Sequence, residues 1–320
     1  MRLFVTGGAG FIGSNYVRRV LSTTDARVTA YDALTYAGNR ETVADLVDDP
    51  RFTLVQGDVR DRPAVEAAMA GHDTVVHFAA ETHVDRSIVG PEAFVSTNCG
   101  GTEVVMGAAV RHQVARVVHI GTDEVYGSVE AGSSGEDDLL APRSPYAASK
   151  AGADLIALAH HHTYGLPVAV TRCANNLGPF QHPEKAVPRF TTRLLEGRPV
   201  PLYGDGLHQR DWLHVEDHCA AVHLVLERGV PGEIYNVGAG HPIANRELVD
   251  RLLALTGRGT ELVQPVTDRP GHDRRYAVDS TKVRALGWAG ARPLDEALAA
   301  TVAWYRGNEW WWRPLAGDPR

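Results

Sequence analysis

The sequence predicts an α/β protein whose main part is a doubly wound parallel sheet. Short β-branched runs alternate with helical stretches through residue 172, and a glycine-rich turn directly follows the first run. Beyond Cys173 the pattern changes to loops rich in Gly, Pro and charged side chains. We therefore predict a first domain over residues 1–172, to which the chain returns at about 211–240, and a smaller, mixed C-terminal domain over residues 173–320.

The composition of the 320-residue chain argues against several classes of function. A net charge of -7 argues against a broad nucleic-acid surface. No apolar run has the length of a membrane span, and a strand begins at residue 2, where a signal peptide would need room. The three cysteines lack the spacing of a metal site. We expect a soluble, cytoplasmic protein without a bound metal.

The first strand, residues 2–6, runs into a turn in which Gly7, Gly10 and Gly13 have the spacing G-x-x-G-x-x-G. Such glycines let the turn close, let a pyrophosphate approach backbone N–H groups, and let the following helix pack on the strand. The spacing alone is weak evidence. Its place between a strand and a helix, however, indicates a dinucleotide site.

A second strand, residues 27–31, ends at Asp32, about twenty residues beyond the glycines. A carboxylate at this place accepts hydrogen bonds from the adenosine ribose and repels a 2′-phosphate. The sequence therefore predicts a Rossmann domain that binds NAD rather than NADP, although Arg40 lies nearby in the chain.

The next strands bring further polar groups to the same edge of the sheet. A third strand, residues 52–58, ends in Asp58, which is either an adenine contact or an ordinary turn aspartate. A fourth strand, residues 74–80, ends in small residues that let a cofactor pass closely. The polar residues 81–87 then form either a solvated loop or part of the site, and residues 91–111 are predicted as one long helix.

A third group of polar residues follows the apolar run at residues 117–120, which predicts a buried parallel strand. Thr122, Asp123 and Glu124 come just past its carboxyl end. Because ligands bind at this edge of an open α/β sheet, we expect these three side chains to belong to the site.

Tyr146 and Lys150 are predicted to lie one turn apart on one helix, because Ser144 has the position of an N-cap and Pro145 that of the first helical residue. A phenol with a pKa of roughly 10 becomes a base near neutral pH only where cations, here Lys150 and a nicotinamide, favour its phenolate. Taken alone, such a pair is more often an ordinary helix contact. Its position behind a nucleotide fingerprint favours a catalytic role.

The C-terminal part contains loops crowded with cationic and amide side chains, at residues 174–185, 204–212 and 269–276. Guanidinium groups suit phosphate oxygens, so these loops indicate an anionic substrate, although isolated charges of this kind are more often solvated surface. Residues 309–314 include three consecutive tryptophans and are predicted to dock on the smaller domain.

Motifs extend over nearly the whole chain, namely T-G-G-A-G-F-I-G, A-A-E-T-H-V-D-R-S, T-D-E-V-Y-G, S-P-Y-A-A-S-K, N-N-L-G-P, P-E-K, R-D-W and R-P-G-H-D-R-R-Y. With them the chain resembles the extended short-chain dehydrogenase/reductase superfamily and, within it, the dTDP-glucose 4,6-dehydratases. The pair Asp123 and Glu124 carries the distinction, since epimerases of the same superfamily usually have small or hydroxyl residues there. Leu177 and His182 depart from the family, which usually has Tyr and an aromatic residue at these positions.

The resemblance implies dehydration of dTDP-glucose to dTDP-4-keto-6-deoxyglucose by an internal hydride transfer from C4 to C6 through bound NAD. It implies that Tyr146, with Lys150 and Thr122, takes the proton of the sugar 4-hydroxyl. Glu124 would then remove the C5 proton while Asp123 protonates the departing 6-hydroxyl. This is the chemistry of a hydro-lyase in deoxysugar biosynthesis.

The resemblance also implies binding residues by position, and a homodimer joined through residues 91–111 and the helix that carries the tyrosine. The implied cofactor contacts are Gly7, Gly10, Phe11, Ile12, Gly13, Asp32, Leu34, Thr35, Asp58, Val59, Phe78, Ala79, Ala80, Thr97, Tyr146, Lys150 and Asn176. The implied substrate contacts are Thr82, Thr122, Asp123, Glu124, Asn175, Lys185, Ala186, Pro201, Tyr203, Arg210, Asn245, Arg269 and His272.

Two other functions are compatible with this fold. A sugar-nucleotide 4-epimerase or a related dehydrogenase would use the same Tyr146 and Lys150 without loss of water from its substrate. A non-catalytic NAD-sensing protein usually lacks one of these two residues, and both are present here.

Overall fold

The structure, a computed structural model, describes residues 1–317. Its centre is a 7-stranded sheet with the order β11-β6-β5-β4-β1-β2-β3, in which all neighbouring strands are parallel. The strands are β1 (Arg2–Thr6), β2 (Arg27–Asp32), β3 (Phe52–Gln56), β4 (Thr74–His77), β5 (Arg116–Thr122), β6 (Val168–Cys173) and β11 (Ile234–Val237). The order confirms the predicted doubly wound sheet, because the chain builds from β1 to one edge and then continues from β4 to the other.

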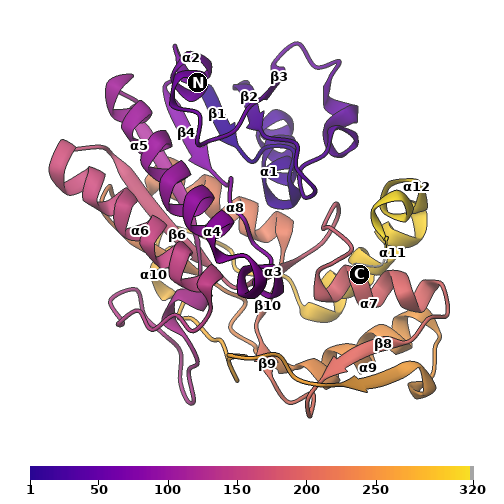
Figure 1. Cartoon of the computed structure of the whole chain (residues 1–320). Coiled ribbons are helices and arrows are strands. Elements are labelled where there is room, and N and C mark those ends of the chain that lie inside the picture. Colours follow the sequence, from indigo (N-terminus) through magenta and orange to yellow (C-terminus); the bar gives the residue numbers. More distant parts are fainter. Residues whose placement is uncertain (318–320) are drawn as a thin grey trace.

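Helices cover both faces of this sheet (Figure 1). The helices α1 (Phe11–Thr23) and α8 (Val215–Arg228) share one hydrophobic core with the strands, and α2 (Arg62–Met69), α5 (Gly101–Arg111) and α6 (Pro145–Tyr164) share the other. The central strand β4 is therefore buried along its whole length, as a parallel strand between two helical layers must be. Strand β11 comes from the segment that we expected to return to the first domain, while the domain boundaries themselves stay predictions.

Strand β4 ends at His77, three residues before the predicted end, and this shortening matters for the site. The Phe78 N–H still donates to the Thr6 carbonyl, but the Ala79 N–H turns to the Thr6 hydroxyl at 3.3 Å. The backbone after residue 77 thus leaves the sheet and is free to border a cavity. Similarly, β3 ends at Gln56, before Asp58.

The predicted helix at residues 91–111 is continuous but not uniform. It begins as α4 (Pro91–Phe94), widens into the π-helical segment η2 (Val95–Gly100) and continues as α5. Within η2, Asn98 donates to the Glu81 carbonyl at 3.0 Å and to the Ser149 hydroxyl at 2.8 Å. Such π turns are common at functional sites because they re-aim side chains, and here Thr97 lines the main cavity. The segment α3 (Val84–Val89) is helical, where we had predicted a loop or site segment.

The second part of the chain forms a smaller unit below the sheet in Figure 1. Its elements are β7 (Asn175–Leu177), α7 (Ala186–Leu195), β8 (Val200–Tyr203), β9 (Gln209–Arg210), β10 (Trp212–His214), β12 (Ile243–Ala244), α9 (Asn245–Thr256), η4 (Thr260–Leu262), β13 (Val263–Val266) and α11 (Leu294–Gly307), whereas α10 (Thr281–Ala285) packs on the large sheet. Three two-stranded sheets, β7 with β10, β8 with β13 and β9 with β12, hold it together. No helix within residues 1–317 combines the length and apolar character that crossing a bilayer requires.

The tryptophan-rich C-terminal segment forms α12 (Glu309–Trp312) and η5 (Arg313–Leu315). Trp312 is fully buried against Tyr305 of α11, as predicted for a segment that docks on the smaller unit. The indole of Trp311, however, donates to the hydroxyl of Thr42 in η1 (Arg40–Leu46), at 3.3 Å. The segment therefore also contacts the nucleotide-binding part, which the sequence did not predict.

Candidate active site

A cavity of about 340 Å³ runs along the carboxyl ends of the central strands, where the sequence predicted a ligand site. Every predicted cofactor residue except Leu34 lines it, and so do the five predicted catalytic residues. Leu34 instead packs its side chain against the core, and its φ of 53° turns the chain just after Asp32. The fold thus brings these residues together from segments that lie far apart in the sequence.

The glycine turn has the close backbone approach that its spacing indicated. Gly7 has a φ of 68°, and a Cβ there would lie 2.8 Å from the backbone nitrogen of Ala79. A Cβ on Gly13 would lie 2.1 Å from the Gly7 carbonyl oxygen. Larger residues would therefore push α1 away from β1 and close the space in which a pyrophosphate meets the start of the helix.

Asp32 ends β2 at the far end of the cavity and is held in place by backbone N–H groups. Its Oδ2 accepts from Ala9 at 3.0 Å, and its Oδ1 accepts from Leu34 at 2.9 Å. Burial raises the pKa of Asp32, while these N–H groups lower it and favour the carboxylate. Arg40 donates to Gln56 at 2.9 Å instead of pairing with Asp32. A fixed carboxylate that pairs with no cation among residues 1–317 fits the ribose of NAD and disfavours a 2′-phosphate.

Thr122, Asp123 and Glu124 lie where the strand β5 gives way to the short helix η3 (Asp123–Tyr126). Their exposed fractions are 7%, 2% and 9%. The Thr122 hydroxyl donates to Asp123 Oδ1 at 3.4 Å. Asp123 Oδ2 is buried without a hydrogen-bond partner within residues 1–317, so it is available to a ligand in the cavity.

The two adjacent carboxyl groups have different electrostatic surroundings. Burial and the negative charges of Glu124 and Asp211 raise the pKa of Asp123 well above its ordinary value. Burial also raises the pKa of Glu124, but the cations Arg210, Arg269 and Lys185 act against this rise. The negative neighbours of Asp123 favour its protonated form, and the cations around Glu124 favour its carboxylate, as a paired acid and base require.

Tyr146 and Lys150 lie on α6 as predicted, since Ser144 caps this helix by accepting from the Ala147 N–H at 3.1 Å. Lys150 Nζ donates to the Ile120 carbonyl at 2.5 Å and is almost fully buried. Burial and the Glu124 charge raise the pKa of Tyr146 well above its ordinary value. The chain alone therefore does not produce the lowered pKa that we expected for Tyr146. A cationic cofactor is needed in addition to Lys150.

A second cavity of about 180 Å³ extends from Glu124 into the smaller unit. Every predicted substrate residue lines this cavity or the first one. Lys185 Nζ bridges to the Thr82 carbonyl at 2.7 Å, and Arg269 forms an ion pair with Asp85 at 3.3 Å. The cavity is therefore lined by cations as well as by the Glu124 carboxyl group, and the cations suit an anionic ligand. Leu177, the departure from the family pattern, is fully buried in the core of the smaller unit.

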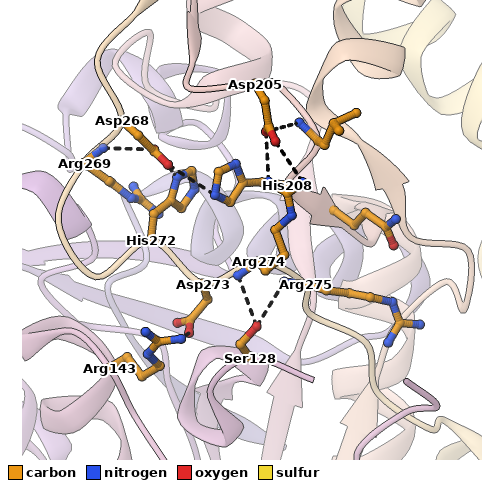
Figure 2. A network of polar contacts seen from close by, with 12 residues as sticks. Ser128, Arg143, Asp205, His208, Asp268, Arg269, His272, Asp273, Arg274 and Arg275 are labelled. Carbon is orange, nitrogen blue, oxygen red and sulfur yellow. Dashed lines mark hydrogen bonds and ion pairs between the residues drawn. The ribbon is translucent and has the colours of Figure 1, made fainter. Parts of the chain in front are cut away.

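His208, Asp268 and His272 lie together (Figure 2), and His272 lines the second cavity. His272 Nδ1 lies 2.7 Å from Asp268 Oδ1, and the two imidazole rings stack at 3.8 Å with an angle of 11°. Stacked rings direct their nitrogen lone pairs along parallel planes, whereas a metal needs lone pairs that converge on one point. Burial lowers the pKa of His272 to about 4, so this residue offers a neutral ring to the substrate.

Sequence reasoning missed several residues of the site. Arg189 and Phe190 line the second cavity from α7, where no motif marks them. Tyr276 was part of a quoted motif but received no role, although its hydroxyl lies 3.4 Å from Glu124 Oε2. Its position in a cation-rich loop was the signal that could have singled it out.

Comparisons with known proteins show the family of the chain. The family model described as GDP-mannose 4,6 dehydratase matches residues 4–301. A dTDP-glucose 4,6-dehydratase from Streptomyces antibioticus is 53% identical to the chain, over 100% of this chain and 96% of its own length. The chain belongs to the dTDP-glucose 4,6-dehydratase family.

Solved structures of dehydratases and of epimerases show which proteins share the fold of this chain. The dehydratase DesIV from Streptomyces venezuelae, solved with NAD and TYD bound, has a TM-score of 0.97 and 51% identity, covering 98% of this chain and 100% of that one. A UDP-glucose 4-epimerase from Thermus thermophilus, solved with NAD, has a TM-score of 0.90 and 33% identity, covering 96% and 100%. The fold is therefore shared with epimerases, while the higher identity lies with dehydratases.

Proposed function

We propose that the protein is an NAD-dependent hydro-lyase that converts dTDP-glucose to dTDP-4-keto-6-deoxyglucose. The observation that carries this proposal is the pair of buried carboxyl groups, Asp123 and Glu124, which lie in the same cavity as Tyr146 and Lys150. An epimerase needs no acid for a departing hydroxyl, so this pair supports dehydration.

Tyr146 acts as the base in the first half of the reaction. Its phenolate accepts the proton of the sugar 4-hydroxyl, and the buried ammonium of Lys150 stabilises the phenolate charge. Bound NAD supplies the hydride acceptor for C4 and the hydride donor for C6. Lys150 is fixed by its hydrogen bond to the Ile120 carbonyl, so its charge is oriented before substrate arrives.

The two carboxyl groups act as base and acid in the second half of the reaction. A ketone at C4 acidifies the C5 hydrogen, and Glu124 removes it as a proton because Arg210, Arg269 and Lys185 favour its carboxylate form. Asp123, whose protonated form is favoured by burial, gives its proton to the 6-hydroxyl as water departs. Glu124 then returns a proton to C5.

Mass spectrometry tests this function directly. The purified protein is incubated with dTDP-glucose, and the product is expected to be lighter than the substrate by one water. An isomer of unchanged mass would instead establish an epimerase. UDP-glucose and GDP-mannose, offered separately, test the choice of base, and turnover of either at the rate of dTDP-glucose would contradict the proposed substrate.

The protein is expected to purify with NAD already bound, because a cycle that restores its own cofactor gains nothing from releasing it. Denaturing the protein and assaying the supernatant for NAD and NADP measures this. Recovery of NADP would contradict the role proposed for Asp32.

We also propose a homodimer formed through the face that contains α3, η2 and α6. Apolar side chains are exposed on these elements, with 40% of Ile88, 89% of Val89, 54% of Val95 and 57% of Leu155 accessible. Burying them against a second copy would remove this apolar surface from water. Light scattering after gel filtration should show a dimer for the parent protein and a monomer for Leu155→Glu.

A further inference from the structure

A chain of hydrogen bonds leads away from Glu124, and the proposed reaction leaves it without a role. The Tyr276 hydroxyl lies 3.4 Å from Glu124 Oε2. The same hydroxyl donates to Asp273 Oδ2 at 2.7 Å. Tyr276 and Asp273 are 3% and 2% exposed. The row of three groups, namely the Glu124 carboxyl, the Tyr276 phenol and the Asp273 carboxyl, is therefore buried throughout.

The outer end of this chain is the buried Asp273, which lies beside an exposed arginine. Asp273 Oδ1 lies 3.4 Å from Arg143 Nη1, and the Arg143 side chain is 56% exposed. Figure 2 shows Arg143 approaching Asp273 from the side away from the imidazole pair. The buried chain therefore leads from the proposed base to a carboxyl group that lies against a solvent-exposed arginine.

Arg210 holds the middle of the chain in place. Its guanidinium lies 4.2 Å from the centre of the Tyr276 ring, and its Nη2 donates to the Asp273 carbonyl at 2.9 Å. A guanidinium stays protonated at any working pH, so Arg210 orients the two residues and does not itself exchange protons. Lys185, another cation near Glu124, is engaged with the Thr82 carbonyl.

The directions of the hydrogen bonds suit proton transfer. A phenol has one proton, and the shorter contact shows that Tyr276 gives it to Asp273. Its oxygen can then accept a proton from Glu124 only when Glu124 is protonated, which is its state after it has taken the C5 proton. Burial raises the pKa of Tyr276, so the phenol stays neutral while it passes protons on.

We propose that Tyr276 and Asp273 form the path by which Glu124 exchanges its proton with solvent during turnover. This inference rests on the function proposed above. Tyr276 and Asp273 are positioning residues here, since each acts on the substrate through Glu124.

The step balances as follows for atoms and charge. The O–H bond of protonated Glu124 breaks as its proton moves to the Tyr276 oxygen, while the proton of Tyr276 moves to Asp273 Oδ2. Glu124 ends as a carboxylate, Tyr276 as a neutral phenol, and Asp273 as a carboxylic acid that releases its proton to water beside Arg143. The reverse path brings a solvent proton to Glu124 before C5 is protonated.

The experiment runs dTDP-glucose in deuterated water, stops at low conversion, and reduces the keto product with borohydride so that its acidic C5 hydrogen cannot exchange later. Mass spectrometry or NMR then gives the share of product that has kept the substrate's own C5 hydrogen. The parent protein should keep it in a minority of product molecules. Tyr276→Phe should keep it in a majority, because the proton taken by Glu124 has no path out and returns to C5.

Two further variants separate proton transfer from packing. Asp273→Asn still accepts a hydrogen bond from Tyr276 but cannot take its proton, so it should behave as Tyr276→Phe does. Tyr235→Phe is the matched control, since the Tyr235 hydroxyl bonds to the Val230 N–H far from the site, and it should behave as the parent does.

A slower reaction with unchanged labelling in Tyr276→Phe and Asp273→Asn would overturn the path, because a structural role lowers the rate without changing the fate of the C5 proton. Retention of the substrate's C5 hydrogen by the parent would overturn it as well. If the parent releases no water from dTDP-glucose, the proposed function itself fails, and that outcome is separate from the labelling result.

Discussion

The two ends of the site differ in how they use charge. At the reaction end, Asp123, Glu124 and Lys150 are buried, with 2%, 9% and 4% of their surface exposed, and burial shifts the pKa of each. At the outer rim, Arg274 pairs with Asp205 although their side chains are 50% and 52% exposed. A buried charge interacts strongly with its neighbours, whereas an exposed pair is screened by water and salt.

This difference separates chemistry from binding. Substitutions at the reaction end should lower kcat, because they remove groups that act on the transition state. Substitutions toward the rim should raise KM, and the effect should shrink as exposure grows. The following experiments test that gradient, in order of decreasing effect.

Tyr146→Phe should lower kcat by about a thousandfold, within the usual range for loss of a positioned acid or base. The ring keeps its packing, so the dissociation constant for dTDP-glucose, measured by calorimetry, should change little. A turnover rate within a few fold of the parent would show that Tyr146 is not the base.

Glu124→Gln should lower the rate of water release by about a hundredfold, because the base needed after C4 oxidation is lost. Oxidation at C4 does not need Glu124, so a 4-keto hexose with an intact 6-hydroxyl should accumulate on the protein and be found by mass spectrometry after quenching. Asp123→Asn is the control, since it keeps the base and should still exchange the C5 hydrogen in deuterated water. Equal C5 exchange in Glu124→Gln and the parent would contradict the assignment.

The pH dependence of water release should follow Asp123. Burial raises the pKa of Asp123, so its protonated form persists to a higher pH than that of an ordinary aspartic acid, and kcat should fall as the pH rises through that pKa, by about tenfold for each further unit. Asp123→Asn has no titrating acid at this position, and its lower rate should lack that alkaline decline. A decline of the same shape in both proteins would assign it to another group.

Arg269→Gln should raise KM for dTDP-glucose by about tenfold, the loss expected for one charge-assisted hydrogen bond, with kcat changed less. Arg269 is partly exposed, with 22% of its side chain accessible, so it lies between the two extremes. Asp85→Asn removes its ion-pair partner without removing the cation and serves as the control. A fall in kcat larger than the rise in KM would place Arg269 at the reaction end.

Arg274→Ala should have the smallest effect, a change in KM of less than about threefold that disappears when salt is added. The reason is that its partner Asp205 and the guanidinium itself both face water. Steady-state kinetics at low and high salt measure this. A large effect at high salt would show that the ion pair holds the loop over the substrate.

The sequence by itself determined the sheet and the reaction end. The G-x-x-G-x-x-G turn predicts a strand before it and a helix after it, because a tight turn between these two elements needs glycines at this spacing. In the structure, Gly7 in this turn has a φ of 68°. Ser144 and Pro145 predicted the start of α6 because capping is a local interaction between residues three apart. Once those elements were placed, Tyr146 and Lys150 had to share one helix face.

Only the tertiary structure decided the contacts between distant segments and the pKa values. The approach of Tyr276 to Glu124 joins residues that a sequence pattern cannot pair, since it depends on how the smaller unit packs against the sheet. The π turn that brings Thr97 to the cavity, and the contact of Trp311 with Thr42, are decided by the same packing. The raised pKa values of Asp123 and Glu124 follow from burial, which the cations of the smaller unit oppose at Glu124, and burial is a property of the folded chain.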